Sequence, residues 1–287
     1  MCGIFGYSGF RGATLDPAIV ERMGASITYR GPDDSGIHHA PHAALGNRRL
    51  SIIDVTGGHQ PFYSADRRIV VVQNGEIFNY QELQRELVAT GAQFDTKSDT
   101  EVILRLYEME GIAGIRRLNG MFAIAILDQR SNELFLVRDR LGVKPLYFGE
   151  HQGRLLFGSE IKALLAGGMS ARASPAALDQ FLTFNYVPLP LTAFAGIHHV
   201  MPGHYLRITR ESFEQVRWWN IADIQPESGR SEAEWIDEFL VTLDDAVRIR
   251  LRADVPFGAF LSGGVDSSTI VGLMARHVDL PIKTFCI

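Results

Sequence analysis

The sequence predicts an α+β fold with antiparallel sheets, followed by a shorter α/β unit with a parallel sheet. Pairs of short apolar segments joined by polar turns predict antiparallel strands in the first ~160 residues. Amphipathic segments with helix-start signals lie among them, which predicts helices layered on sheets. The last stretch, from residue 255 onwards, has the order strand, glycine-rich loop, helix, strand, which is one βαβ unit.

The composition is that of a globular protein without an obvious polyanionic partner. The 287 residues are 46% hydrophobic and 21% charged, enough for one large or two medium domains. A net charge of −5 gives no basic surface for nucleic acid or membrane lipid. No apolar run is long enough to span a bilayer, and the N-terminus lacks a signal-peptide pattern. Two cysteines cannot form a disulfide framework, which is typical of a cytoplasmic protein. From the charge and the short apolar runs we expect neither nucleic acid nor membrane as partner.

The first strand candidates lie on either side of a turn-rich segment. Residues 3–7 form an apolar run, and residues 49–54 and 68–73 are further strand candidates. RGPDDSG, over residues 30–36, has the glycine and proline content of a loop. We therefore expect at least three strands before the first long helix.

Two capping-box patterns predict the next helices. Residues 79–82 (NYQE) begin a helix that stops near Gly91, and residues 98–101 (SDTE) begin a second that ends at Gly111. Two strand pairs follow: MFAIAILD with ELFLVRD, and PLYFG with RLLFG. The polar turns QRSN and EHQG connect the members of each pair, so both pairs are expected to be antiparallel.

Domain boundaries are expected on either side of a proline-rich stretch. Ser174 and Pro175 open a short helix, and FNYVPLPLTAF after it is expected to be extended. A small sheet from GHYLRI and EQVRWW either closes the first domain or bridges to the next. The resulting prediction is a first domain at 2–185, a linker with a small sheet at 186–230, and a second domain at 231–287.

The second domain begins with a long helix that carries one apolar stripe. Ser231 and Glu234 form another capping box. The stripe recurs every four residues: Trp235, Phe239, Leu243, Val247 and Leu251. Because a single βαβ unit cannot cover both faces of a parallel sheet, we expect this domain to be incomplete and to expose apolar surface.

Cys2 is a candidate nucleophile. Removal of Met1 would leave a thiol and a free α-amine on the same residue. A free thiol has a pKa of about 8.5 and an α-amine one of about 7.7–8.0, so the amine is able to take the thiol proton. The alternative is an ordinary buried cysteine near a terminus, which position alone favours.

Three further positions each carry two interpretations. Arg49 is either a bidentate ligand for a carboxylate or a surface arginine. Asn74 and Gly75 either form a hairpin turn or supply two N–H donors to an oxyanion. Asp99 either caps a helix or binds an ammonium group.

These segments together resemble one family. MCGIFG, RGPDDSG, RLSIID, NGEIFNY, KSDTE, LNGMFAIAI and RDRLGVKPLYF occur in the order found in the class II, N-terminal-nucleophile glutamine amidotransferases. The resemblance covers about residues 2–165 and implies a four-layer α/β/β/α sandwich in which Cys2 attacks the glutamine amide. It implies that Asn74 and Gly75 stabilise the oxyanion, Arg49 binds the α-carboxylate and Asp99 the α-ammonium. The implied lining is completed by Leu50, Ser51, Ile52, Ile53 and Glu76.

LSGGVDSS, at residues 261–268, lies between a predicted strand and helix. Its N–H groups either cradle a phosphate or only close a βα turn. Asp266 would repel polyphosphate unless Mg²⁺ is bound, so the Mg²⁺ assignment falls on Asp266. The segment resembles the SGGxDS loop of ATP pyrophosphatases, which implies ATP as cofactor. The implied ATP contacts are Leu261, Ser262, Gly263, Gly264, Asp266, Ser267, Ser268 and Ile287.

The two resemblances together indicate the glutamine-hydrolysing asparagine synthetase family, class B. This implies glutamine, aspartate and ATP as substrates, β-aspartyl-AMP as the intermediate that ammonia attacks, and a homodimer. For this chain alone we expect glutaminase activity without asparagine formation. Two alternatives stay open: amidation of another carboxylate, as in polysaccharide or peptide modification, and a regulatory module without turnover.

Overall fold

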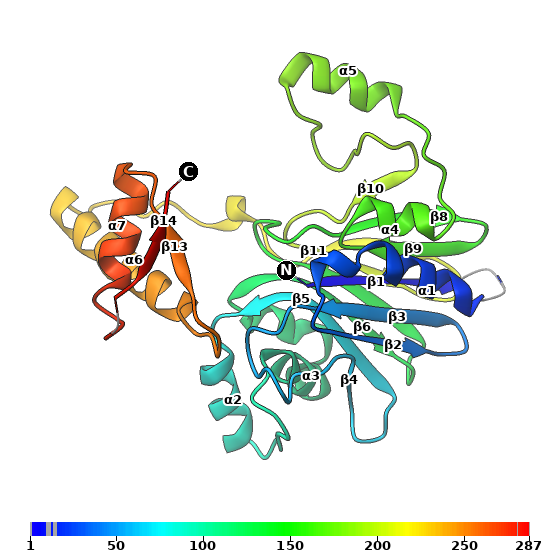
Figure 1. The fold of residues 1–287 in the computed structure, drawn as a ribbon, viewed down its shortest axis with the longest axis horizontal. Helices are drawn as coiled ribbons and strands as arrows, with labels where there is room; N and C mark the ends of the chain where they lie inside the picture. Colours follow the sequence, from blue (N-terminus) through cyan, green and yellow to red (C-terminus); the bar gives the residue numbers. More distant parts are fainter. Residues whose placement is uncertain (1, 10–12, 14–15, 280, 287) are drawn as a thin grey trace. The chain divides into compact units, whose positions relative to one another are not determined.

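The computed structural model describes residues 2–9, 13, 16–279 and 281–286. The chain forms two compact units (Figure 1). The first unit runs to Ser51 and continues from Thr56 to Ile221; the second comprises Ile52–Val55 and the residues from Ala222 onwards. Each unit is described by itself below.

The first unit contains two six-stranded antiparallel sheets, which confirms the predicted α+β class. The first sheet has the order β10-β8-β9-β1-β3-β2, and the second β12-β11-β7-β6-β5-β4. The strands of the first sheet are β1 (Gly3–Gly9), β2 (Asp34–His39), β3 (Ala43–Arg49), β8 (Tyr147–His151), β9 (Arg154–Gly158) and β10 (Ile197–His199). Those of the second are β4 (Phe62–Tyr63), β5 (Ile69–Ile77), β6 (Gly120–Asp128), β7 (Glu133–Arg138), β11 (His204–Ile208) and β12 (Phe213–Arg217).

Helices cover the outer faces of the two sheets. The first sheet carries α1 (Pro17–Ser26) and α4 (Ile161–Ala166), while α3 (Asp99–Glu110) packs on β5 and β4, with α2 (Tyr80–Ala89) against α3. The facing sides of the sheets share an apolar core that includes Ile4, Val72, Ala125 and Phe157. The result is the predicted order of helices, sheet, sheet, helices (Figure 1). The remaining helical elements of the unit are η1 (Thr28–Arg30), η2 (Gly111–Arg117) and α5 (Pro175–Phe184).

The predicted helix starts are found, but their caps differ. Ser98 accepts from the Thr100 N–H as expected, and Gly111, with φ +62°, ends α3. Glu101 instead accepts the N–H groups of the preceding 95–96 turn at 3.0 and 2.8 Å. Among the described residues Asn79 caps nothing in its own helix; its amide binds the 117–119 loop, so the capping box predicted there is wrong. The adjacent turn competes for Glu101, and a loop about 40 residues away competes for Asn79.

The strand predicted at 49–54 is also wrong, because β3 ends at Arg49. The backbone beyond it bonds to side chains instead of a neighbouring strand: Leu50 N–H points at Cys2 Sγ, at 3.4 Å, and Ser51 N–H donates to Asp33 Oδ2 at 2.9 Å. Arg49 therefore lies at the end of a strand, not at its start.

Asn74 and Gly75 lie inside β5 and form no hairpin turn. They pair with Ala123 and Phe122 of β6, and β5 continues to Ile77. Of the two interpretations that the sequence left open for these residues, the turn is excluded.

The segment expected to be a linker contributes strands to the first unit. β10 pairs with β8, and β11, which forms a hairpin with β12, pairs with β7. The small sheet therefore extends the second large sheet, and the first unit continues to Ile221.

The second unit contains η3 in part (Ile221–Asp223), α6 (Glu232–Arg250), β13 (Gly258–Phe260), α7 (Val265–Met274) and β14 (Lys283–Phe285). The capping box of Ser231 and Glu234 is formed, and β13 and β14 pair in parallel as predicted. Along the apolar stripe of α6, Val247 is buried but Trp235 and Phe239 are 42% and 62% exposed. None of the helices in the described ranges is both long and apolar enough to cross a membrane.

Candidate active site

Cys2 lies directly before β1 in a largely enclosed position. Its Sγ is 3.4 Å from Leu50 N and 3.5 Å from Leu50 O, and its carbonyl accepts from Arg30 Nε at 2.8 Å. Burial raises the pKa of the thiol above its ordinary value, and the nearby Asp99 carboxylate raises it further. The Leu50 N–H and the Arg49 guanidinium lower it. A buried thiol with these neighbours needs a local base to become a nucleophile.

The segment after β3 is held beside this thiol. Asp33 Oδ2 fixes Ser51, and the RGPDDSG loop approaches the backbone so closely that a Cβ on Gly31 would lie 2.3 Å from Arg49 N. Arg49 is buried, with 5% of its surface exposed. Arg49, Leu50 and Ser51 therefore share one wall with Cys2.

Asn74 lies on β5 of the second sheet and is linked through Ser159 to β1 of the first sheet. It is 1% exposed, and its Nδ2 lies 3.1 Å from Ser159 Oγ, which also accepts the Ile4 N–H at 3.0 Å. Gly75, with φ +155°, approaches β6 so closely that a Cβ would lie 2.1 Å from the Met121 carbonyl oxygen. The Ser159 side chain thus connects Asn74 to β1, the strand that directly follows Cys2.

The Asp99 charge acts on both the Cys2 thiol and the Glu76 carboxyl group. Asp99 Oδ2 accepts from Ile77 N at 2.9 Å and from Gln73 Nε2 at 3.1 Å. Burial raises the pKa of Asp99, and these hydrogen bonds oppose the shift. The pKa of Glu76 is raised by burial and then by the Asp99 charge, while Lys144 lowers it. A bound cation would stabilise the ionised form of both carboxyl groups, because burial disfavours that form in each.

Ile52 and Ile53 are not brought together with these residues in one unit. They belong to the second unit, where Ile52 O accepts from Asp254 N at 2.9 Å. Their predicted part in a glutamine pocket therefore has no support from contacts within the first unit.

The SGGVDSS segment leads from β13 into α7 as predicted. Ser262 and Ser267 hydroxyls lie 3.1 Å apart, and Gly263 has φ +80° with open space where a Cβ would be. Asp266 lies in the first turn of α7. The other predicted ATP contacts here are Leu261, Gly264 and Ser268, all on the same loop and helix start; Ile287 lies outside the described residues.

This loop offers hydroxyl and backbone N–H donors, which suit phosphate oxygens. Metal ligands are scarcer: over residues 2–9, 13, 16–279 and 281–286, no group of three His, Cys, Asp or Glu side chains is placed to hold an ion. Asp266 by itself fits Mg²⁺ only where phosphate oxygens supply most of the ligands.

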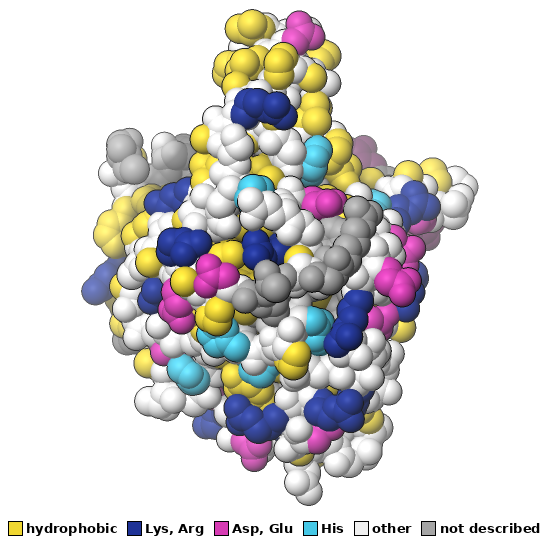
Figure 2. Space-filling view, turned by 90° about the vertical axis from the view of Figure 1, so that its right-hand side faces the viewer, with side chains coloured by type: hydrophobic (Ala, Val, Ile, Leu, Met, Phe, Trp, Pro, Cys, Tyr) yellow, Lys and Arg dark blue, Asp and Glu magenta, His cyan; other side chains and the backbone are white. Residues whose placement is uncertain are grey.

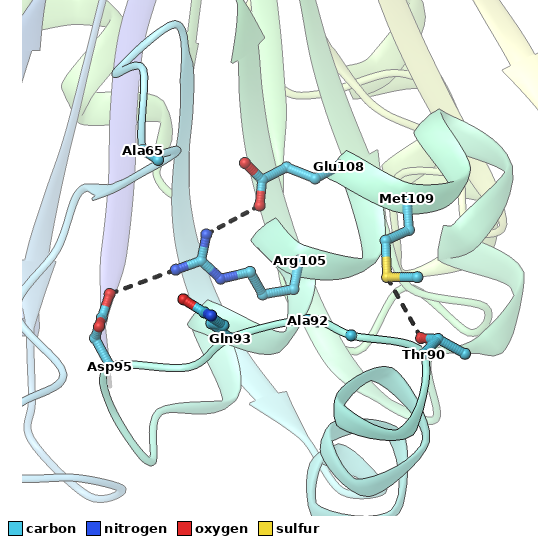
Figure 3. Close-up of a pocket in the computed structure, with 9 residues that line it drawn as sticks. Ala65, Thr90, Ala92, Gln93, Asp95, Arg105, Glu108 and Met109 are labelled. Atoms are coloured by element: carbon cyan, nitrogen blue, oxygen red, sulfur yellow. Dashed lines mark hydrogen bonds and ion pairs between the residues drawn. The ribbon is translucent and has the colours of Figure 1, made fainter.

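A surface pocket in the first unit contains none of the predicted site residues. It has a volume of about 360 Å³ and lies between the end of α2 and α3 (Figure 3). Arg105 reaches into it but is bound by Glu108 at 3.0 Å and Asp95 at 3.5 Å, so its charge is already neutralised. On the face of the molecule shown in Figure 2, acidic and basic side chains are also interspersed.

Comparison with protein families decides the affiliation. A family model described as a glutamine amidotransferase domain matches residues 1–219. The chain belongs to this family. A second model, described as asparagine synthase, matches residues 238–287. The two matches reproduce the order of domains that the sequence motifs predicted.

The curated relatives of this chain include asparagine synthetases and amidases. It is 36% identical over 301 residues to asparagine synthetase [glutamine-hydrolyzing] 3 of Bacillus subtilis, covering 100% of this chain and 48% of the relative. It is 40% identical to amidase chyE of Penicillium rubens, covering 87% and 37%. The chain spans about half the length of the curated relatives it matches. A solved structure, glutamine phosphoribosylpyrophosphate amidotransferase from B. subtilis, shares the fold with a TM-score of 0.58 at 20% identity, covering 99% of this chain and 65% of that one.

Several residues around the amidotransferase site were missed by the sequence analysis. Arg30 holds the Cys2 carbonyl and Asp33 holds Ser51, although both lie in the quoted RGPDDSG motif. Gln73 positions Asp99 from β5, and Ser159 contacts both Ile4 and Asn74. The RGPDDSG motif could have identified Arg30 and Asp33, because both belong to it. Ser159, 155 residues from Ile4, had no local sequence signal.

Proposed function

We propose that this amidotransferase domain hydrolyses glutamine with Cys2 as nucleophile. The observation that carries the proposal is the set of buried groups near the Cys2 thiol: the charges of Arg49 and Asp99 act on this thiol, and Asn74 is linked through Ser159 to Ile4, two residues along the chain. Such a set supplies a thiol, a cation for a carboxylate, an amide donor and an anion for an ammonium group. These are the groups that an α-amino acid with a side-chain amide requires.

The reaction needs a base because burial raises the pKa of the Cys2 thiol. After removal of Met1, the α-amine of Cys2 accepts the thiol proton, and Sγ attacks the amide carbon of glutamine. The proton then passes to the leaving nitrogen, the C–N bond breaks, and ammonia leaves a thioester on Sγ. Water attacks the thioester carbon, giving glutamate and restoring the thiol and amine.

Substrate orientation falls to the charged residues. Arg49 is proposed to bind the α-carboxylate bidentately, with Leu50, Ser51 and Glu76 lining the site. Asp99 is proposed to bind the α-ammonium. Because burial raises its pKa, an arriving ammonium ion favours the ionised carboxylate and releases any bound proton. Asn74 Nδ2 and Gly75 N–H are the proposed donors to the tetrahedral oxyanion.

In the whole protein we propose that the ammonia amidates a carboxylate activated with ATP. The proposed phosphate contacts are the hydroxyls of Ser262, Ser267 and Ser268 and the N–H groups of the glycines between them, with Asp266 near Mg²⁺. ATP supplies a leaving group to an otherwise unreactive carboxylate. Aspartate is the proposed acceptor, because relatives named asparagine synthetase match over nearly the whole chain. A cytoplasmic homodimer remains a further prediction from the resemblance.

A second candidate differs only in the acceptor. Relatives named amidase, from Penicillium rubens and Gibberella zeae, are 40% and 37% identical to this chain. An acid other than aspartate is therefore the alternative. With ATP, glutamine and a panel of carboxylic acids, the complete protein should release AMP and pyrophosphate only with its own acceptor.

The glutaminase proposal is tested by mass and turnover together. Intact mass should give a chain beginning at Cys2, and glutamate should form from glutamine. Cys2→Ala should lose glutamate formation and labelling by 6-diazo-5-oxonorleucine, a glutamine-like electrophile. Cys286→Ala, which removes the exposed cysteine, should retain both. Full turnover by the Cys2→Ala protein, or by protein that keeps Met1, would contradict the proposal.

A further inference from the structure

Ser159 closes a ring of hydrogen bonds with the strand that carries the thiol. It follows β9 directly and is 0% exposed. Its N–H donates to Ile4 O at 2.9 Å, and its Oγ accepts from Ile4 N at 3.0 Å. Ile4 is two residues from Cys2, so the hydroxyl is fixed relative to the thiol by two bonds to β1.

The same oxygen contacts Asn74 on the other sheet. Asn74 Nδ2 lies 3.1 Å from Ser159 Oγ, and in the described part of the chain this is the one hydrogen bond of the Asn74 side chain. Asn74 Oδ1 is buried and unpaired. An amide held at one point, with its other atoms free, is available to a ligand and depends on that point for its orientation.

We propose that Ser159 is a positioning residue that orients the Asn74 amide toward the amide carbon attacked by Cys2. An NH₂ group has two hydrogens; Ser159 binds one and leaves the second for the oxyanion. A donor fixed before the reaction stabilises the transition state more than one that must reorient. Without the hydroxyl, the Asn74 amide is free to rotate while the thiol stays in place. The inference rests on the glutaminase function proposed above and adds a residue to it.

The first experiment separates the oxyanion from the thiol. Ser159→Ala should lower kcat for glutamine hydrolysis by about 10- to 100-fold, with KM within about twofold of the wild type. Alkylation of Cys2 by iodoacetamide builds no oxyanion, so its rate should stay unchanged. Ser64→Ala is the matched control: it removes another buried hydroxyl, which accepts the Ile69 N–H at 2.9 Å, and should change neither rate.

The second experiment is a double-mutant cycle. If Ser159 acts through Asn74, Ser159→Ala should cost nothing further in an Asn74→Ala background. Additive losses, or an alkylation rate that falls together with kcat, would overturn the inference. An unchanged kcat in Ser159→Ala would overturn it alone, whereas an unchanged kcat in Asn74→Ala would overturn the proposed oxyanion role as well. Ser159→Cys, with a weak acceptor of similar shape, replaces Ser159→Ala if that protein does not fold.

Discussion

Substitution of Gly75 tests whether the close approach of β5 to β6 at this position requires a glycine. In Gly75→Ala the new Cβ would lie 2.1 Å from Met121 O and 2.6 Å from Phe122 Cα, both backbone atoms of β6. An ordinary contact begins at 3.4 Å, so the two strands must separate by about 1.3 Å at this point. No side chain is able to move aside to relieve this clash.

The expected cost has two parts. Positive φ, here +155°, costs an alanine about 1–3 kcal/mol. Overpacking against backbone costs about 1–3 kcal/mol more. Gly91→Ala isolates the first part, because Gly91 has φ +101° but nothing within 4 Å of the new Cβ. Gly75→Ala should therefore be less stable than Gly91→Ala by about 1–3 kcal/mol.

Calorimetry of the two variants measures this difference. For a unit of this size, 1 kcal/mol corresponds to about 2–4 °C in Tm, so the Gly75 variant should unfold roughly 2–12 °C below the Gly91 variant. Hydrogen–deuterium exchange should rise in β5 and β6 of the Gly75 variant only. Equal Tm values, or unchanged exchange in these strands, would refute the argument from close approach.

Three further predictions concern charge around the site. Because burial raises the pKa of Cys2, alkylation of this residue by iodoacetamide in substrate-free enzyme should be slow at pH 7 and still be rising above pH 9; a plateau below pH 8 would contradict this. Asp99 has a raised pKa in the fold, so its contribution to stability is present at low pH and is lost as pH rises through that pKa. Asp99→Asn should therefore have a larger free energy of unfolding than wild type at pH 7, by a margin that shrinks toward pH 4. Its KM for glutamine should rise at least about 10-fold. A stability margin that grows on acidification would contradict the raised pKa of Asp99. Asp33→Ala removes the acceptor of the Ser51 N–H and should raise KM about 10-fold, whereas Asp34→Ala next to it should not; equal effects would show that Asp33 has no special role.

The errors of the sequence analysis have a common origin. The capping box at Ser231 was predicted correctly because both of its partners lie within three residues. The box at Asn79 failed because the 117–119 loop, about 40 residues away, binds the same amide. The strand predicted at 49–54 failed because Cys2 and Asp33 bind its backbone. Propensity describes what a segment prefers alone, and each failure is a place where a distant partner offers a better bond.

The sequence by itself determined the α+β class and the order of the two domains, and it proposed the thiol, cation, amide and carboxylate that a glutaminase requires. The fold class follows from periodicity and turn chemistry, whereas the domain order and the candidate site residues follow from the resemblance of the ordered motifs to a known family. Only the tertiary structure decided that Asn74 lies within a strand, that the hairpin of β11 and β12 completes the second sheet, and that Ser159 joins the Cys2 strand to Asn74. Those features depend on contacts between residues far apart in sequence, and hydrogen-bonding groups at such separations leave no pattern in the sequence until the sheets face each other.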